Sequence, residues 1–249
     1  MTDPAPDLGD LQGIWRRDWL RAPGIEDAET EVLWFQAGPW HVDLRLPPGL
    51  EALSGPLSGL DANALDLVAQ AEGFAGETTL ERGVCAWRRK INWRGPTEGP
   101  DAGRLSWRDE ALHEDGVFAD YEELWRRDAP GPAEALRLTD DAGRLAILIR
   151  VGDRFALGRA APEGMGGAPL AERLRTALAA RHRAALERLF DMEFCCGRLA
   201  EEGGRIERST LPGRAGDLAF AGDPFLGAEA TLLSRSFDGR LLSAPWRRA

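Results

Sequence analysis

Three polar side chains, His41, Asp43 and Arg45, alternate with apolar ones along residues 40–46. If this stretch is a strand, the three share one face, with neighbours roughly 7 Å apart, and we call them the polar stripe. An imidazole beside a carboxylate could be oriented for acid–base chemistry. We favour the alternative, in which the polar stripe faces water and the intervening residues face the core, namely Trp40, Val42 and Leu44.

A second group of cations lies within residues 85–93, where Arg88 and Lys90 occupy alternate positions. If both point inward, toward the polar stripe, they form a cationic pocket for an acidic ligand. If both point outward, they belong to a solvated face. The outward orientation is favoured, because the opposite face carries the residues that prefer a core, namely Cys85, Trp87, Ile91 and Trp93.

Arg89 falls on that same apolar face and interrupts it. A buried arginine needs a partner, and the face of a tryptophan ring is one that it can use. We therefore predict that the Arg89 guanidinium stacks on Trp15 or Trp87.

The remaining candidates for chemistry are weaker. One resembles a metal-ligand cluster and consists of His113, Glu114 and Asp115. Adjacent strand residues point to opposite faces, so the three could bind one ion only in a loop. Three ligands without a fourth group nearby are also not a zinc motif. We predict an exposed acidic turn there and no metal site. The sequence holds no nucleophile elbow, dinucleotide fingerprint or HExxH pattern, so no cofactor is predicted.

The elements that would position these residues are mostly short strands. Residues 32–36 and 40–46 form a predicted hairpin around Ala37-Gly38-Pro39, and prolines at 47 and 48 end it. A short helix is predicted over residues 61–72, with Asp61 as its N-cap. The other strands expected in this half are residues 11–20, 74–82, 84–93, 103–107, 111–114 and 118–128, and the high charge density of residues 118–128 leaves a helix as the alternative there.

The best linker signal is Ala129-Pro130-Gly131-Pro132, and the order of elements before it is repeated after it. An amphipathic helix is predicted over residues 170–190. The strands predicted around that helix are residues 135–140, 144–150, 154–159, 192–200, 205–209, 217–220, 231–236 and 240–242.

Many short strands with two helices predict a mainly β protein made of two antiparallel barrel halves, each with one helix. A parallel sheet is excluded because it would need helices between most strands. One large barrel is the alternative. The predicted organisation is a disordered N-terminus (1–10), a first barrel (11–128), a linker (129–133) and a second barrel (134–249).

Several motifs carry a family resemblance. Gly13-Ile14-Trp15 at the start of the first strand is similar to the first-strand motif of lipocalin-like barrels, in which the tryptophan plugs the closed end and an arginine stacks on it. The resemblance implies this plug for Trp15, with Arg89 as its arginine. Together with Leu-Trp-Phe-Gln (33–36), Cys-Ala-Trp-Arg-Arg-Lys-Ile-Asn-Trp (85–93) and Ala-Asp-Tyr-Glu-Glu-Leu-Trp (119–125), the motif resembles an uncharacterised bacterial family.

That bacterial family is distantly similar to fungal proteins with a tandem lipocalin-like (calycin-like) β-barrel. The resemblance covers residues 11–128 and implies a fold. It brings no activity and no catalytic residues.

Bulk composition narrows the function classes. The 249 residues carry a net charge of -10, which argues against nucleic acid and against anionic membranes as partners. No apolar run approaches the roughly 20 residues of a membrane span. Three cysteines without an even framework, and no signal peptide at the N-terminus, predict a cytoplasmic protein.

Three functions fit an uncharacterised soluble barrel protein. The first is binding of a small apolar or aromatic acidic ligand inside a barrel. The second is a scaffold with filled barrels whose acidic surface selects a basic partner. The third is a barrel enzyme of isomerase or lyase type that uses His41 or Tyr121, which we rank last. An interior cavity above roughly 300 Å³ would favour binding over the scaffold. The predicted ligand contacts are Trp34, Gln36, His41, Asp43, Arg45, Arg88, Lys90 and Tyr121.

Overall fold

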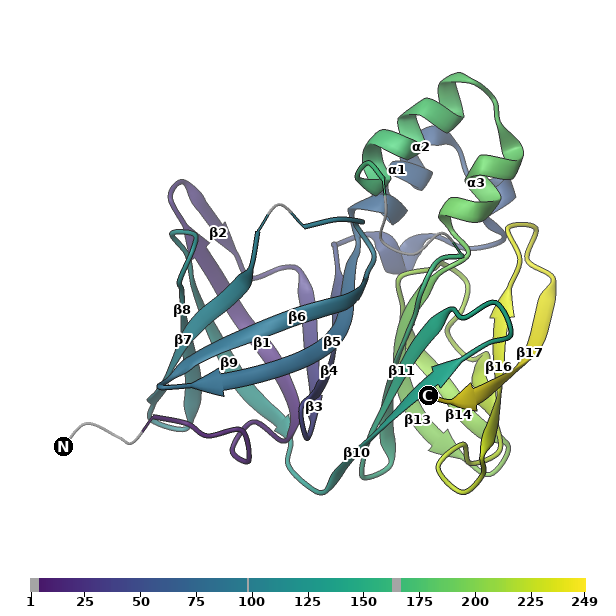
Figure 1. Cartoon of the computed structure of the whole chain (residues 1–249). Coiled ribbons are helices and arrows are strands. Elements are labelled where there is room, and N and C mark those ends of the chain that lie inside the picture. Colours follow the sequence, from purple (N-terminus) through teal and green to yellow (C-terminus); the bar gives the residue numbers. More distant parts are fainter. Residues whose placement is uncertain (1–4, 98, 163–166) are drawn as a thin grey trace.

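The computed structural model describes residues 5–97, 99–162 and 167–249, and it contains two antiparallel β-barrels side by side (Figure 1). The first barrel closes through pairing of its first and last long strands, β1 and β9. The short strand β2 (Ile25–Asp27) extends β1 at the edge. The strands of the first barrel are β1 (Gly13–Ala22), β3 (Glu31–Ala37), β4 (Trp40–Leu46), β5 (Glu72–Glu81), β6 (Val84–Asn92), β7 (Asp101–Arg108), β8 (Ala111–Gly116) and β9 (Glu122–Ala129).

The second barrel is a closed meander in which β10 pairs with β17. Its strands are β10 (Ala133–Thr139), β11 (Leu145–Val151), β12 (Arg154–Arg159), β13 (Glu193–Ala200), β14 (Gly203–Ser209), β15 (Leu218–Ala221), β16 (Glu229–Arg235) and β17 (Leu241–Arg248). Side chains such as Phe155, Phe220 and Trp246 fill its interior with an apolar cluster. The predicted mainly β class and the two barrels are confirmed, and the alternative of one large barrel is wrong.

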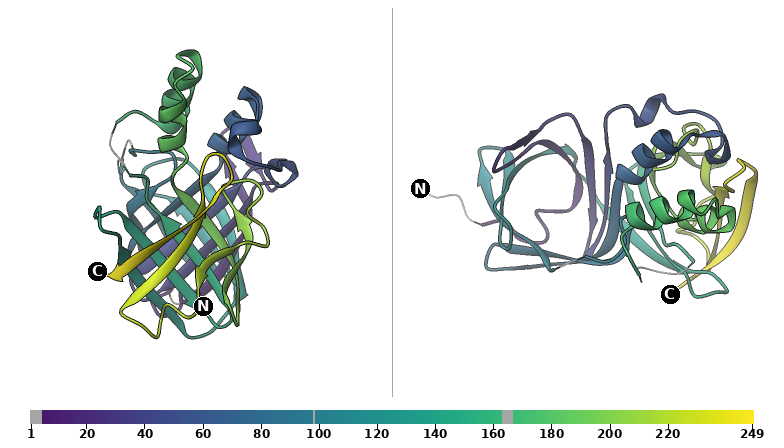
Figure 2. Two further views of the ribbon diagram at one scale, coloured as in Figure 1. Left: turned by 90° about the vertical axis from the view of Figure 1, so that its right-hand side faces the viewer. Right: turned by 90° about the horizontal axis from the view of Figure 1, so that it is seen from above.

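Helices α1 (Ala62–Gln70), α2 (Leu170–Ala179) and α3 (Arg183–Leu189) lie over one end of the second barrel (Figure 2). The Asp61 side chain caps α1 by accepting a hydrogen bond from the Ala64 N–H at 2.8 Å. The single helix predicted over residues 170–190 is broken, because Arg181 adopts a left-handed backbone with φ of 50°. The N–H groups of Arg181 and His182 bond back to the Leu178 and Ala177 carbonyls, which ends α2.

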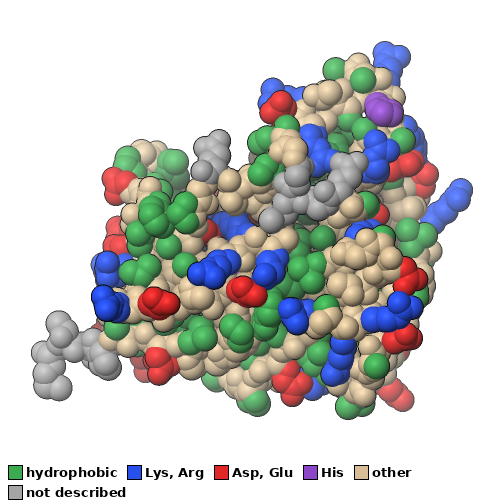
Figure 3. Space-filling model, viewed as in Figure 1, with side chains coloured by type: hydrophobic (Ala, Val, Ile, Leu, Met, Phe, Trp, Pro, Cys, Tyr) green, Lys and Arg blue, Asp and Glu red, His purple; other side chains and the backbone are tan. Residues whose placement is uncertain are grey.

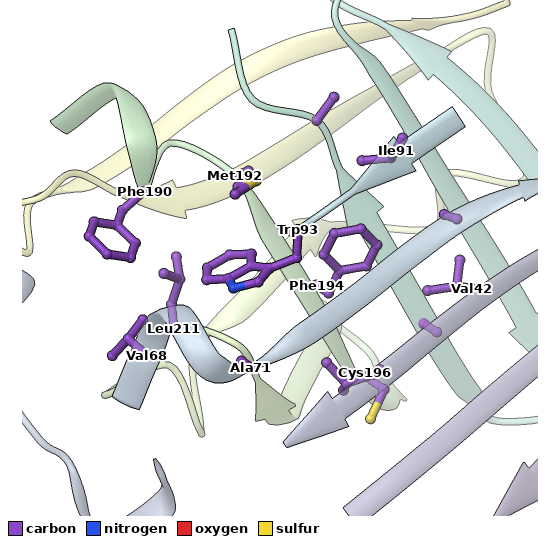
Figure 4. Close-up of a cluster of buried hydrophobic side chains, with 14 of the residues drawn as sticks. Val42, Val68, Ala71, Ile91, Trp93, Phe190, Met192, Phe194, Cys196 and Leu211 are labelled. Carbon is purple, nitrogen blue, oxygen red and sulfur yellow. The ribbon is translucent and has the colours of Figure 1, made fainter. Parts of the chain in front are cut away.

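The largest apolar core lies between the barrels and beneath the helices. It combines Val42 and Leu44 of β4 with Ile147 and Ile149 of β11 and Phe194 of β13. Trp40, Val42 and Leu44 therefore face apolar surroundings, as predicted, but this core belongs to the junction of the two barrels. Figure 4 shows Phe194 close to Ile91 and Trp93 in this region.

Phe194 lies against two glycines, one from each barrel. A Cβ at Gly73 of β5 would fall 2.3 Å from the Phe194 ring, and one at Gly158 of β12 would fall 2.7 Å from it. Only residues without side chains permit this approach, so these glycines set how closely the barrels pack.

One smaller feature differs from the sequence predictions. Residues 5–10, expected to be disordered, form a turn in which Asp7 and Asp10 exchange hydrogen bonds between backbone N–H groups and carboxylates. Residues 1–4 of the same prediction lie outside the described residues. On the surface that Figure 3 views, cationic and acidic side chains are interspersed.

Candidate functional site

A cavity of about 180 Å³ lies inside the first barrel, toward the end where β4 stops and β9 begins. Its wall combines aromatic side chains with charged ones from several strands. The lining residues are Leu20, Trp34, Asp43, Arg45, Phe74, Trp87, Arg89, Asp101, Glu114, Tyr121, Glu123 and Trp125.

The opposite end of this barrel is closed by Trp15 and the chain that precedes β1. The Trp15 indole is buried, and its Nε1–H donates to the Leu11 carbonyl at 2.8 Å. The Arg127 guanidinium lies 4.3 Å from the Trp15 ring centroid. Arg127, and not the predicted Arg89, therefore lies over the Trp15 ring at this end of the barrel.

Arg89 does not stack on a tryptophan; its guanidinium lies 3.6 Å from the Phe74 ring centroid instead. Arg89 keeps the inner face that it shares with Trp87, and there it pairs with the carboxylates of Glu72 and Asp101. A β-bulge follows it, because the pairing of β5 with β6 shifts between Ala75 and Gly76. The extra residue, Lys90, moves Ile91 to the outer face, where Ile91 joins the core between the barrels.

The middle of the first barrel is a column of indole rings. Trp34 stacks on Trp15 with centroids 6.2 Å apart, and it meets Trp87 and Trp125 edge-on at 5.6 and 5.7 Å. Its Nε1–H donates to the Gln36 side chain at 3.0 Å. The indoles of Trp34, Trp87 and Trp125 thus give the cavity an aromatic floor with fixed orientation.

Above this floor, two arginines lie among several carboxylates. Arg45 contacts Asp43 at 2.8 Å and Glu123 at 3.7 Å. Arg89 contacts Glu72 at 3.0 Å and Asp101 at 2.7 Å. Burial opposes ionisation of Glu72, but Arg45 and the other nearby arginines dominate and lower its pKa to about 2. Burial raises the pKa of Asp43 to about 6, in spite of Arg45.

Glu114 is the most perturbed carboxyl in the cavity wall. It accepts hydrogen bonds from the Tyr121 hydroxyl at 2.7 Å and from the Trp125 indole at 3.0 Å. Burial, and then the negative charge of Glu123, raise the pKa of Glu114 to about 8. Burial, and then Glu114, also raise the pKa of Tyr121. At neutral pH the barrel therefore holds a carboxyl group that retains its proton.

His41 lies in a buried layer outside the cavity wall. Its Nδ1 contacts the Thr78 hydroxyl at 3.0 Å, and that hydroxyl donates to the Gln36 side chain at 2.9 Å. Burial, and then the charge on Arg89, lower the pKa of His41 to about 3. The ring is neutral at physiological pH and does not border the space where a ligand would lie.

The structure brings together half of the predicted ligand contacts. Trp34, Asp43, Arg45 and Tyr121 line the cavity, and Gln36 and His41 lie buried beyond the wall. The interpretation that the polar stripe faces water is wrong, since His41 and Asp43 are buried inside the first barrel. Arg88 and Lys90 are exposed, as favoured, and Lys90 pairs with Glu77 at 3.2 Å.

Sequence reasoning missed most of the acidic wall. Glu114 and Glu123 face each other across β8 and β9 and are buried, although their segments were predicted as an exposed turn and a highly charged strand. The signal was alternation, because Leu112, Glu114, Glu123 and Trp125 share one face of that strand pair.

No protein-family model and no curated protein matches this chain. Among solved structures, the crystal structure of an uncharacterized protein from Saccharomyces cerevisiae matches with a TM-score of 0.55 at 11% identity. The match covers 94% of this chain and 96% of that chain. It confirms the predicted likeness to a fungal protein at the level of the fold alone, across both barrels. Among the described residues, none of the helices has the length and apolar character needed to cross a membrane.

Proposed function

We propose that the first barrel binds a small molecule in its interior cavity. The observation that carries this proposal is the contrast between the barrels. The second barrel is filled by apolar side chains, whereas the first keeps a cavity walled by fixed aromatic rings and charged groups. Convergent polar groups in an aromatic pocket are typical of a ligand site. The volume of about 180 Å³ does not reach the roughly 300 Å³ that would favour binding over the scaffold by size alone. The proposal therefore rests on the lining of the cavity, and the ligand has few heavy atoms.

The balance of charge favours an organic cation, such as a small ammonium compound. The cavity wall carries the carboxyl groups of Asp43, Asp101, Glu114 and Glu123 but only two guanidinium groups, those of Arg45 and Arg89. With Glu114 protonated, the wall keeps three carboxylates against two guanidinium groups, and Arg17 behind the wall pairs with one of these carboxylates, that of Glu123, at 2.8 Å. Buried charge is costly unless it is paired, and indole faces attract cations. The acidic ligand expected from the sequence depended on Arg88 and Lys90 pointing inward, and both are exposed.

A titration against matched ligands tests this proposal. We expect choline to change the intrinsic tryptophan fluorescence, while its uncharged analogue 3,3-dimethylbutanol and the anion acetate have much weaker effects.

Asp101→Asn should weaken choline binding about tenfold or more, as expected for loss of one charged partner. Glu77→Gln changes the net charge equally but lies outside the cavity, paired with Lys90, and should bind as the unaltered protein does. Preference for acetate, or no response to choline, would refute a cation site.

The other two functions have less support. The enzyme alternative named His41 or Tyr121, and His41 does not border the cavity. The filled second barrel suits a supporting role for that half of the chain. A cytoplasmic location is supported by the three cysteines, all buried and free among the described residues.

A further inference from the structure

A second cluster of chemistry-bearing side chains lies outside the cavity, on the outer face of β8 and β9. His113 and Asp115 are on β8, and Glu122 is paired with Asp115 across the strands. One imidazole nitrogen and one oxygen from each carboxylate all lie within 4.8 Å of one another. The sequence suggested His113, Glu114 and Asp115 as a cluster, but Glu114 points into the barrel and Glu122 takes its place.

The imidazole of this cluster is oriented but incompletely satisfied. His113 Nε2 lies 3.0 Å from a Glu122 oxygen, at hydrogen-bond distance. Nδ1 is buried and makes no hydrogen bond among the described residues, although Asp115 Oδ2 lies 3.3 Å away. A buried ring nitrogen without a partner is unusual and needs a physical reason.

Among the described residues, the carboxylates of the cluster also make no ion pair with an arginine or lysine. Arginines pair with most buried acids of this barrel, as Arg17 does with Glu123 at 2.8 Å. Within the described part of the chain, no arginine or lysine lies within ion-pair distance of Asp115 or Glu122, although Arg104 and Arg21 are their cross-strand partners on β7 and β1. The Asp115 side chain is 56% exposed, so the cluster is open to solvent on one side.

We propose that His113 and Asp115, with Glu122 orienting the imidazole, bind a divalent transition-metal ion of the zinc and manganese class. Imidazole suits zinc and carboxylate oxygens suit manganese, so a mixed set selects ions of this group over calcium. Nδ1 is the ring nitrogen that is available as a ligand, while Glu122 holds the imidazole through Nε2, as a carboxylate does for many metal-binding histidines. Two protein ligands at a partly exposed position leave the remaining coordination sites open to water.

Titration with metal salts tests the site on the full chain, with any affinity tag removed. We expect one Zn²⁺ per chain by calorimetry, and a single Co²⁺ with the visible absorption of a nitrogen–oxygen site. Trp19 lies 6.3 Å from the His113 ring, so Co²⁺ should quench part of the tryptophan fluorescence, and Trp19→Phe should remove that part. His113→Ala and Asp115→Asn should abolish binding, and Glu122→Gln should weaken it by about 10–100-fold.

The control variants separate this cluster from non-specific metal binding. Glu110→Gln removes an exposed acid in the turn before β8, at the end of the strand away from Asp115, and His182→Ala removes the exposed histidine between α2 and α3. Both should retain the stoichiometric ion. Persistence of binding in folded His113→Ala, loss of it in His182→Ala, or absence of stoichiometric binding of Zn²⁺, Mn²⁺ and Co²⁺ would overturn the proposal.

Discussion

At the scale of single residues, the first barrel is distinguished by buried charge. Arg17, with a side chain 3% exposed, joins Glu123 and Asp27, and Arg45 joins Asp43. Isolated buried charges are strongly destabilising, so each of these groups is retained only in a network of partners. Glu114 is the exception, because its hydrogen bonds come from neutral donors, Tyr121 and Trp125. It therefore stays protonated well above its usual range.

This protonated carboxyl makes stability depend on pH. The Glu114 pKa is about 8 in the folded chain and 4.5 as its ordinary value, so between these pH values the folded state binds more protons than the unfolded state. Stability then falls as pH rises from about 5 to 8. We expect Glu114→Gln to flatten that decline, because the amide cannot ionise but can still accept a hydrogen bond.

Urea denaturation at pH 5, 6, 7 and 8 measures the effect on the free energy of unfolding. Asp43, with a pKa of about 6, adds a smaller decline in the lower part of this range, which the variant should keep. Glu110→Gln, an exposed neighbour on the β7–β8 turn, should behave like the unaltered protein. An equally steep decline between pH 6 and 8 in Glu114→Gln would show that Glu114 is ionised in the folded chain.

At the scale of elements, the strands were predictable because their alternation is regular. Residues 40–46 were predicted as a strand and form β4 with those bounds. The alternation did not predict the surroundings of each face of the strand. Both faces of β4 are buried, one in the first barrel with Asp43 and one against the second barrel with Val42. Periodicity separates two faces of a strand but does not identify the core that each one meets.

Local irregularities of the backbone explain two other sequence predictions that were wrong. The bulge at Lys90 reverses the side-chain direction within β6, so Arg89 and Ile91 face opposite ways although they are two residues apart. The left-handed Arg181 divides a continuous helical pattern into α2 and α3. Neither Lys90 nor Arg181 is a glycine or proline, so the sequence gives no local signal of the break at either position.

The glycine contact between β5 and β13 gives a prediction at this scale. Gly73→Ala places a methyl group against the Phe194 ring, which is wedged between Gly73 and Gly158 and cannot retreat freely. We expect a loss of about 1–3 kcal/mol in the free energy of unfolding, as for other overpacked cores. Gly59→Ala is the matched control, because its nearest neighbour would be 4.0 Å away. Chemical denaturation compares the two, and equal stability of both variants would contradict the packing argument.

At the scale of the whole molecule, the two barrels share their largest core. Leu44 and Ile91 of the first barrel, Ile149 and Phe194 of the second and Leu174 of α2 belong to one apolar cluster. Separating the barrels would expose this cluster to water, at roughly 25 cal/mol for each Å² of apolar surface. Neither barrel is therefore expected to persist once the other has unfolded.

The distribution of probes along the chain makes this cooperativity measurable. Every tryptophan except Trp246 lies in residues 13–129, so intrinsic fluorescence reports mainly on the first barrel. Cys195 and Cys196 are buried in the second barrel, and Cys85→Ala removes the only thiol of the first. In that variant, fluorescence and the reactivity of thiols to brief pulses of DTNB should change at the same urea concentration, because coincident probes indicate a single transition.

Leu44→Ala opens a cavity in the shared core and should lower the free energy of unfolding by about 2–5 kcal/mol. Because both barrels contribute to that core, the variant should shift both curves together. If the thiols became reactive at a lower urea concentration than the fluorescence change, or if Leu44→Ala moved only one curve, the barrels would be independent folding units that touch without stabilising each other.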